Sequence, residues 1–394
     1  MIYFKNIFVI LSLFVYIYKI KSYFLKSNDL FVNNDILYID KRGFREREFK
    51  WDLPIKYWID PKANLNTNLI EKTLKDISKK TCITWEKMET IINNTTGLNI
   101  RNSGLCASFV GRLSRDMPQE ITFTQSCLNS GRIQHEFSHA LGLVHENRRP
   151  DNEKYITINF TNVEEKDFKK LKSFKNDELE LFNISYDYGS LMHHSSTIYS
   201  KNNLSTILTN DPNYQNTIGQ DNKLKFNDIK KLNLIYCNNV CKKKPLKCKN
   251  GGYMDPKNCK KCRCPPHYGG KTCKMVKKMK KKCKNIVKKA TASKKTFEIN
   301  GKINCYYYIT SSSNYKIKLI IQNSNLPQKE NNGVCIQGKA LEVLYRKDPS
   351  VVGAMFCGIN KNVTILSESN KVSINYVGNS DKNFVKISFQ KVKK

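Results

Sequence analysis

The sequence has few of the features that mark membrane, nucleic-acid-binding or zinc-finger proteins. Its only long apolar run, Ile7 to Tyr18, is interrupted at Ser12 and spans 12 residues, whereas a membrane-spanning helix needs about 20. No nucleic-acid-binding motif accompanies the formal net charge of +34, so we expect no DNA or RNA partner. Histidine is scarce, with six residues in 394, yet three of the six fall in one short motif.

The N-terminal segment has the pattern of a secretory signal peptide. Lys5 precedes the apolar run and a mostly polar stretch follows it, so residues 1–22 are predicted to be removed. A retained N-terminal anchor is the alternative, because the cleavage site is not a clean pattern of small residues. The 14 cysteines are typical of disulfide bonds formed in an oxidising compartment. We therefore expect a secreted, extracellular protein with no membrane span once the signal peptide has been removed.

Two basic clusters indicate proteolytic processing shortly after the signal peptide. Residues 23–47 are predicted to form a pro-segment that is cleaved after Arg42 or after Arg47, although an ordinary basic linker would have the same composition. Glycosylation is also expected, because the chain contains Asn-x-Ser/Thr sequons. These begin at Asn93, Asn94, Asn159, Asn183, Asn203 and Asn362.

Residues 48–237 form the largest cysteine-poor region, and their pattern mixes strands with helices. Residues 54–60 alternate like a strand, and residues 68–80 place Ile70, Leu74 and Ile77 on one helical face. Further strand-like pieces follow at 108–112 and 120–124, and a helix is predicted over 133–143. This mixture predicts an α+β domain.

The rest of the chain predicts two smaller domains. Residues 238–274 contain six closely spaced cysteines and cannot build a large core, so disulfide bonds must stabilise them. A zinc module there is disfavoured, since paired ligands at zinc-finger spacing are missing. After a lysine-rich joint at 274–284, apolar and polar residues alternate, and residues 275–394 are predicted to form a β-sandwich. The six cysteines are Cys241, Cys248, Cys259, Cys262, Cys264 and Cys273.

The residues from 135 to 145, HEFSHALGLVH, carry the chemistry. His135 and His139 are four residues apart, so on a helix they face one metal ion, and Gly142 lets the chain turn so that His145 can supply a third ligand. Three protein ligands leave a position open for water, which is typical of catalytic Zn²⁺. Glu136 can act as the general base on that water, whose pKa zinc lowers to about 7. The pattern predicts a zinc hydrolase with one Zn²⁺ per chain.

The full motif HExxHxxGxxH is the ligand pattern of metzincin proteases, and the extended sequence resembles the astacin family. The resemblance covers residues about 50–237, and it implies a two-lobed protease domain that contains the active-site helix. It also implies a methionine turn, which Met192 matches. The residues that carry the resemblance are His145-Glu146-x-x-Arg149-x-Asp151, Tyr186-Asp187-Tyr188-Gly189-Ser190-Leu191-Met192-His193-His194, Cys106-x-Ser108-x-Val110-Gly111-Arg112, Ile218-Gly219-Gln220 and Tyr236-Cys237.

The resemblance to astacins assigns further roles by position. Met192 would form a hydrophobic floor beneath the metal, and Glu146 would meet the new N-terminus after pro-segment removal. Peptide substrate would add to the strand around Ser108 by β-augmentation. Two disulfide bonds are implied, Cys82–Cys237 and Cys106–Cys127.

Two positions depart from the family pattern. In the family, a tyrosine that can ligate zinc or approach the oxyanion usually follows Met-His. Here His194 occupies that position. An imidazole can also ligate zinc or donate to an oxyanion, but its pKa differs from that of a phenol. In the pro-segment, residues 31–35 look like a stretched version of the latency motif, with Asp35 as the candidate that would occupy the open position on zinc. An unspecialised loop aspartate is the alternative at Asp35.

The two C-terminal regions also resemble known modules. Cys248-x-Asn250-Gly251-Gly252-Tyr253 and Cys264-Pro265 make residues 238–274 similar to an EGF-like domain, without the acidic cluster that calcium binding would need. Residues 275–394 resemble a CUB domain through Gly353 to Gly358, which implies the pairs Cys283–Cys305 and Cys335–Cys357. A protease followed by EGF-like and CUB domains is similar to the secreted astacins of nematodes.

The leading hypothesis is a secreted zinc endopeptidase, in its zymogen form before processing, that cleaves extracellular proteins such as matrix or cuticle. The alternative is a weak or inactive relative that acts as an extracellular binding protein, which His194 favours and the intact zinc motif disfavours. The strongly basic composition is compatible with binding of polyanions alongside either function. Cleavage preference and oligomeric state do not follow from the sequence.

Overall fold

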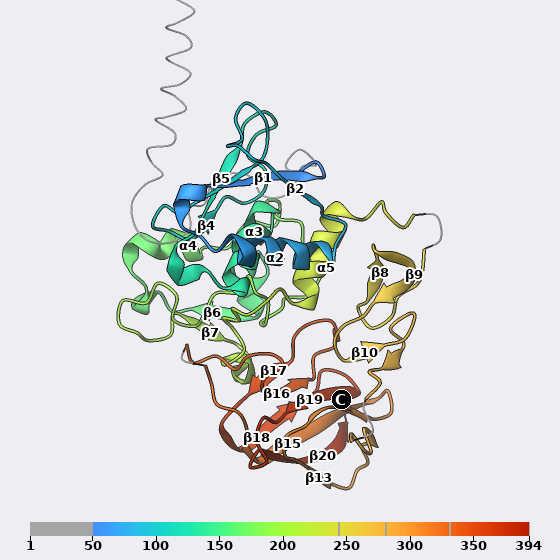
Figure 1. The fold of residues 1–394 in the computed structure, drawn as a ribbon. Helices are drawn as coiled ribbons and strands as arrows, with labels where there is room; N and C mark the ends of the chain where they lie inside the picture. The colour runs from blue at the N-terminus through green and yellow to red at the C-terminus, as the bar shows by residue number, and fades with distance from the viewer. Residues whose placement is uncertain (1–49, 243–244, 280–281, 331, 394) are drawn as a thin grey trace, which may run out of the picture.

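The structure, a computed structural model, describes residues 50–242, 245–279, 282–330 and 332–393. The predicted signal peptide and pro-segment, with Asp35, Arg42 and Arg47, lie outside the described residues. Figure 1 shows a protease domain above a β-sandwich, with a small module, β8 to β10, along one side of both. Within the described part, no helix combines the length and apolar character that crossing a bilayer requires.

The N-terminal lobe of the protease domain is built on a five-stranded sheet with the order β2-β1-β3-β5-β4. The strands run parallel except β4, which is antiparallel to β5 and forms one edge. Buried and half-buried residues alternate along β1, because one face of the sheet packs on helices. The strands are β1 (Ile55–Ile59), β2 (Trp85–Lys87), β3 (Leu98–Arg101), β4 (Ala107–Ser108) and β5 (Gln119–Thr122).

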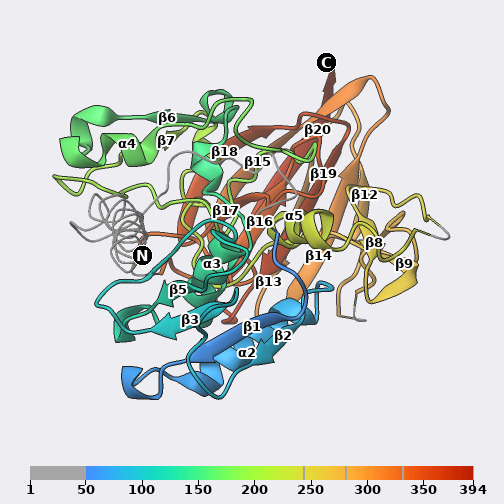
Figure 2. The ribbon, with the colours of Figure 1, turned by 90° about the horizontal axis from the view of Figure 1, so that it is seen from above.

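Two helices, α2 (Thr67–Ser78) and α3 (Ser130–Ala140), pack together against this sheet. Helix α2 begins where the Asn66 side chain accepts a hydrogen bond from the backbone N–H of Leu69 at 3.0 Å. Its predicted apolar face is fully buried. Figure 2 shows α3 between the sheet of the N-terminal lobe and the β-sandwich, so the helix with the metal-binding motif is central in the molecule.

The C-terminal lobe has little regular structure. It contains the short helix α4 (Phe168–Leu171), the hairpin of β6 (Ile156–Ile158) and β7 (Ile207–Thr209), and the closing helix α5 (Phe226–Tyr236). Its buried tyrosines share one apolar cluster with the β-sandwich, whereas α3 and α5 belong to the core of the N-terminal lobe. The closing helix α5 therefore packs into the core of the N-terminal lobe, whereas the tyrosine-rich part of the C-terminal lobe shares a core with the sandwich.

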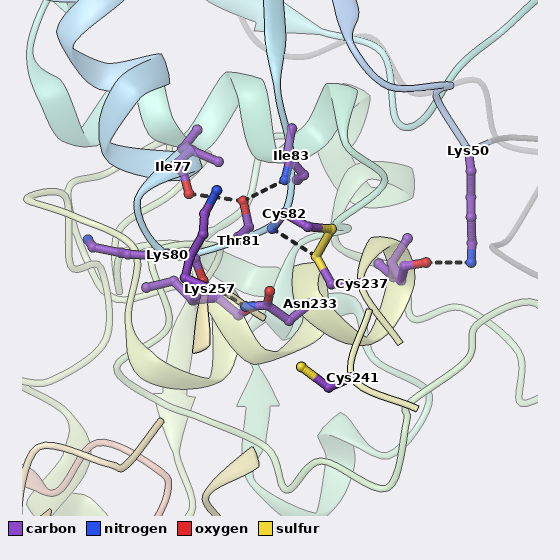
Figure 3. The surroundings of a disulfide bond; sticks show 12 residues. Lys50, Ile77, Lys80, Thr81, Cys82, Ile83, Asn233, Cys237, Cys241 and Lys257 are labelled. Carbon is purple, nitrogen blue, oxygen red and sulfur yellow. Dashed lines mark hydrogen bonds between the residues drawn. A yellow bond between two sulfur atoms is a disulfide. The ribbon is translucent and has the colours of Figure 1, made fainter. Parts of the chain in front are cut away.

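A disulfide bond between Cys82 and Cys237 joins the two lobes (Figure 3). The Asn233 side chain donates to the backbone carbonyl of Lys80 at 3.0 Å, and Thr81 donates to the carbonyl of Ile77 at 2.9 Å. The disulfide bond and the Asn233 contact tie the end of α5 to the end of α2, while the Thr81 contact closes α2 itself. A second disulfide bond, Cys106–Cys127, lies near the edge strand β4.

The module after the protease domain, residues 241–276, consists of two small hairpins closed by disulfide bonds. One hairpin pairs β8 (Tyr253–Asp255) with β9 (Asn258–Arg263), and the other pairs β10 (Tyr268–Gly269) with β11 (Met275–Val276). The lysine-rich joint predicted over residues 274–284 thus overlaps the strand β11, which completes the second hairpin. We call this the EGF-like module; its disulfide bonds are Cys241–Cys259, Cys248–Cys262 and Cys264–Cys273.

The C-terminal domain is a sandwich of two sheets, as the sequence predicts. Their orders are β12-β14-β19-β16-β17 and β13-β20-β15-β18. The disulfide bonds Cys283–Cys305 and Cys335–Cys357 lie in this domain. Its strands are β12 (Val287–Lys289), β13 (Lys295–Asn300), β14 (Asn304–Thr310), β15 (Tyr315–Asn325), β16 (Leu341–Leu344), β17 (Ala354–Phe356), β18 (Ile359–Leu366), β19 (Lys371–Val377) and β20 (Phe384–Lys393).

The sandwich packs directly on the C-terminal lobe of the protease domain. Gln220 donates to the carbonyl of Cys335 at 2.8 Å and accepts from the backbone N–H of Gln337 at 3.0 Å. The hydroxyl of Thr217 accepts a hydrogen bond from the backbone N–H of Met355 at 2.9 Å. These buried hydrogen bonds, together with the shared apolar cluster, join the two domains into one packed unit.

Candidate metal centre and active site

Helix α3 presents the metal-binding motif, and local signals define both of its ends. The helix begins three residues earlier than predicted, because the side chain of Asn129 accepts from the N–H of Arg132 at 3.0 Å and so caps the first turn. It ends at Ala140, and Gly142 then adopts a φ of 98°, a left-handed conformation that favours glycine. This turn carries the chain back to His145.

The three motif histidines converge on one point. Their Nε2 atoms lie 3.0 Å apart for His135 and His139, and 3.1 Å apart for the other two pairs with His145. Zn²⁺ with nitrogen ligands at about 2.0–2.1 Å in a tetrahedron would separate those atoms by about 3.3 Å. The cluster therefore fits Zn²⁺, and among the described residues it is the one group of three or more potential ligands so close together.

Backbone carbonyls orient two of the imidazoles. Nδ1 of His135 lies 3.0 Å from the carbonyl of Leu191, and Nδ1 of His139 lies 2.8 Å from that of Leu143. A proton on each Nδ1 leaves Nε2 with a free lone pair, which is the tautomer that a metal needs. Burial lowers the pKa of His135 to about 4 and lowers the pKa values of His139 and His145 as well, so the imidazoles are neutral at physiological pH.

Glu136 follows the first ligand on α3 and is 4% exposed. A carboxylate so well shielded from bulk water can hold and release a proton beside the metal position. His135 is half-buried, whereas His139 and His145 are fully buried, so the centre opens to solvent on the His135 side. The structure therefore places the predicted base next to the ligand that remains partly accessible.

The methionine turn lies beneath this cluster. Met192 is 1% exposed, and its backbone carbonyl accepts from the N–H of Glu146 at 2.8 Å. Asp228 on α5 holds the turn from below: it accepts from the hydroxyl of Ser190 at 2.6 Å and from the N–H of Leu191 at 3.0 Å. No sequence pattern indicated this role for Asp228, because the contact joins residues 38 positions apart.

The C-terminal sandwich also supports the segment that leads into the turn. Asp187 accepts a hydrogen bond from the backbone N–H of Val352 at 3.0 Å, and Arg346 donates to the carbonyl of Tyr186 at 2.7 Å. A Cβ atom at Gly189 would lie 2.5 Å from the side chain of Val352, so only glycine allows this close approach. Sequence patterns could not reveal this support, since it arises between two domains.

His194, which stands where the family has tyrosine, approaches the cluster from one side. Its Nε2 lies 3.1 Å from Nε2 of His145, but it is not part of the group whose ligand atoms all lie within 4.8 Å of one another. The neighbouring His193 points elsewhere and contacts the hydroxyl of Tyr186 at 2.8 Å. His194 thus stands beside the three-histidine cluster as an adjacent polar group, and direct ligation stays a prediction.

Glu146 is a buried carboxylate with two cationic partners. Arg149 lies 3.1 Å from it, and the ammonium group of Lys231 on α5 contacts its other oxygen. Burial alone would raise the pKa of Glu146, but these cations and the N–H of Asp187 lower it to about 2. Sequence reasoning missed Lys231. A small hollow lined by Glu146, Met192 and Lys231 adjoins the carboxylate, and pairing with a new N-terminus stays a prediction.

The edge strand β4 lies close to the metal centre. The backbone N–H of Gly111, just after this strand, donates to the carbonyl of His139 at 2.8 Å. Among the described strands β4 pairs only with β5, so its other edge could pair with an incoming peptide strand. The strand is two residues long, shorter than the predicted range of 108–112.

A two-lobed α+β domain in which three imidazoles, two from the central helix α3 and one from the turn after it, converge beside a carboxylate defines the class of zinc peptidases. Residues 44–237 match the sequence model of Astacin, a peptidase family, and residues 282–391 match that of the CUB domain. Residues 44–237 thus form a domain of the astacin peptidase family, followed by a CUB domain, which confirms the family and fold expected from the sequence.

Several known proteins are similar to this chain. Zinc metalloproteinase nas-34 of Caenorhabditis elegans is 31% identical over 331 residues, which are 84% of this chain and 54% of that protein. Zinc metalloproteinase dpy-31 of Brugia malayi is 38% identical over 243 residues, 60% of this chain and 40% of that protein. The chain thus spans about half or less of the length of these relatives.

Among solved structures, High choriolytic enzyme 1, a hatching-enzyme zinc protease from Oryzias latipes, is also similar. It matches with a TM-score of 0.44 and 27% identity, over 48% of this chain and 96% of that chain.

Proposed function

We propose that the protein is a secreted zinc-dependent endopeptidase that hydrolyses peptide bonds of extracellular proteins. The observation that carries the proposal is the convergence of three neutral imidazoles beside the buried Glu136. Secretion is supported by seven disulfide bonds that use all 14 cysteines, as expected in an oxidising compartment. Matrix or cuticle proteins are the proposed substrates.

Each residue of the site has a proposed part in the reaction. His135, His139 and His145 would hold Zn²⁺, which when bound would supply Lewis acidity to the scissile carbonyl and to water. Glu136 accepts a proton from the attacking water and donates it to the leaving amine. Strand β4 aligns the substrate backbone by adding it as a further strand. His194 supplies an imidazole beside this centre, where it can donate a hydrogen bond to the developing oxyanion.

The test is turnover of a quenched fluorescent peptide library by processed, zinc-loaded protein. We expect cleavage that a chelator abolishes, and that Glu136→Gln lowers kcat by at least about 10³-fold while zinc content stays at one per chain. Glu153→Gln removes an exposed carboxylate of the same domain and should leave kcat unchanged.

The same experiment separates this function from the alternative. A processed protein that holds one zinc ion per chain yet cleaves no peptide would contradict the proposal. It would favour an inactive relative that binds extracellular partners through its EGF-like and CUB domains. Replacement of His194 by tyrosine would then be expected to restore turnover.

A further inference from the structure

The positive charge of the chain is concentrated in one short segment. Residues 50–240, the protease domain, contain 25 lysines and arginines against 22 aspartates and glutamates, and are nearly neutral. Residues 241–289 contain 19 lysines and arginines and a single acidic residue, Asp255. More than half of the net charge of +34 therefore lies in 49 residues, which a uniform lysine bias would not produce.

The described lysines of the EGF-like module face solvent, and the one carboxylate of the module is buried beside two of its cations. Asp255 is 6% exposed and lies 3.6 Å from Arg263 and 3.9 Å from Lys261. Among the described residues, no other carboxylate forms an ion pair with the cations of this module. The exposed lysines include Lys247, Lys249, Lys257, Lys260, Lys261 and Lys271.

The protease domain adds cations where it meets the module. Arg263 of β9 donates to the carbonyl of Lys79, at the end of α2, at 3.4 Å. Burial lowers the pKa of the neighbouring Lys80; the like charges of Lys223 and Arg263 lower it further, while the carboxylate of Asp76 raises it. Lys80 and Lys257, from different domains, both lie in the surroundings of the Cys82–Cys237 disulfide bond (Figure 3).

The module is held firmly by its inward face, which leaves the basic face outward. Tyr253 packs at a tilt against Phe226 of α5 with ring centroids 5.4 Å apart, and Lys230 donates to the carbonyl of Gly251 at 3.0 Å. At the other end, His267 is 1% exposed and lies 3.4 Å from Glu342 of the sandwich. In Figure 1 the module runs from α5 to the sandwich. Its exposed lysines occur from Lys247 to Lys271, and we call this lysine-rich surface of the module the track.

We propose that this track, together with the adjoining end of α2, is a binding site for a linear sulfated polysaccharide. A chain with evenly spaced sulfates can follow the track and meet many lysine ammonium groups at once. Bound polysaccharide would hold the protease beside substrates in the same matrix. Binding does not depend on peptidase activity and can be measured without it.

Other polyanions fit this face less well. Single-stranded nucleic acid needs exposed aromatic rings for base stacking, but Tyr253 packs on Phe226, and Tyr268 lies 6.4 Å from the ring of Tyr308. A lipid surface favours several apolar side chains among the cations, but among the described residues of the module Met275 alone is an exposed large apolar side chain.

The experiment measures binding of the full chain to heparin by calorimetry at several salt concentrations. We expect the triple variant K257Q/K260Q/K261Q to bind about tenfold more weakly, with a shallower salt dependence, because fewer counterions are released. The control K318Q/K361Q/K386Q loses the same charge from exposed lysines of the sandwich and should change the dissociation constant by less than about twofold.

Three outcomes would overturn the proposal. The first is that both triple variants bind heparin equally weakly. The second is that desulfated heparin binds as tightly as heparin, and the third is that the protein binds phosphatidylserine vesicles or DNA more tightly than heparin.

A second measurement needs no variant: heparin should protect Lys257, Lys260 and Lys261 of the unmodified protein from acetylation, as read by mass spectrometry. Protection of Lys318, Lys361 and Lys386 to the same degree would count against the assigned site.

Discussion

The two sides of the metal centre are built in different ways. On one side, His135, Glu136 and His139 follow one another within a single helix, so the spacing in the chain sets their geometry. On the other side, the turn at Met192 is held by Asp228 on α5, and the segment before it is held by the C-terminal sandwich. The first side depends on local structure, and the second depends on residues far away in the chain.

The largest effect is expected from removing a metal ligand on the helical side of the centre. His139→Gln removes a fully buried ligand, so we expect loss of zinc at micromolar chelator and a fall in kcat/KM of at least about 10³-fold. Metal content by atomic emission and peptide turnover measure the two effects. Arg132→Gln, at an exposed position of the same helix, is the control and should retain both zinc and activity.

The next effect concerns Asp187, whose carboxylate is buried between the turn and the sandwich. Burial, with repulsion from Asp228, raises its pKa to about 7, above the usual value of 3.8. The unfolded chain therefore releases this proton at lower pH than the folded protein. Stability should fall as pH rises from about 4 to about 7, by up to about 4 kcal/mol.

Replacement of this carboxylate by an amide provides the check. In Asp187→Asn the side-chain oxygen can still accept from Val352, but the group does not titrate. Denaturant unfolding at pH 4 and pH 8 should show that the variant gains stability relative to the wild-type protein only at the higher pH. If the stability of the variant falls between pH 4 and pH 8 by as much as that of the wild-type protein, the pH dependence arises from other groups.

The smallest effect tests whether the sandwich supports the turn. Arg346→Ala removes the hydrogen bond to Tyr186 and the guanidinium that lies 5.0 Å from the ring of Tyr155. We expect about 2 kcal/mol lower unfolding stability and several-fold lower kcat, with zinc content and KM unchanged. Lys347→Ala, at the exposed next position, should change neither. A normal kcat in Arg346→Ala would mean that the sandwich does not support the turn.

Much of the candidate site could be predicted because its signals are local. The spacing of the histidines and the glycine at 142 describe a helix, a turn and a third ligand within 11 residues. The class of the C-terminal domain followed from alternating strands. Helix boundaries were less accurate, since the side-chain cap at Asn129 extends α3 by one turn that the apolar pattern does not show.

The remaining features have no local signal. Lys231 pairs with Glu146 across 85 positions, and Arg346 reaches Tyr186 across 160. The relation of His194 to the ligands likewise depends on how the turn is folded beneath α3. Such contacts form only when separate elements pack, and one sequence contains no periodicity that reports them.

The sequence by itself determined the zinc-binding motif, the α+β class, the order of the domains and the uneven distribution of charge. These depend on residue type and on spacing within single helices or strands, which the backbone geometry converts directly into structure. Only the tertiary structure decided that the sandwich supports the methionine turn, that Lys231 pairs with the carboxylate of Glu146, and that the basic module lies fixed against α5. These depend on packing between surfaces, where the positions of distant residues are set by the whole fold.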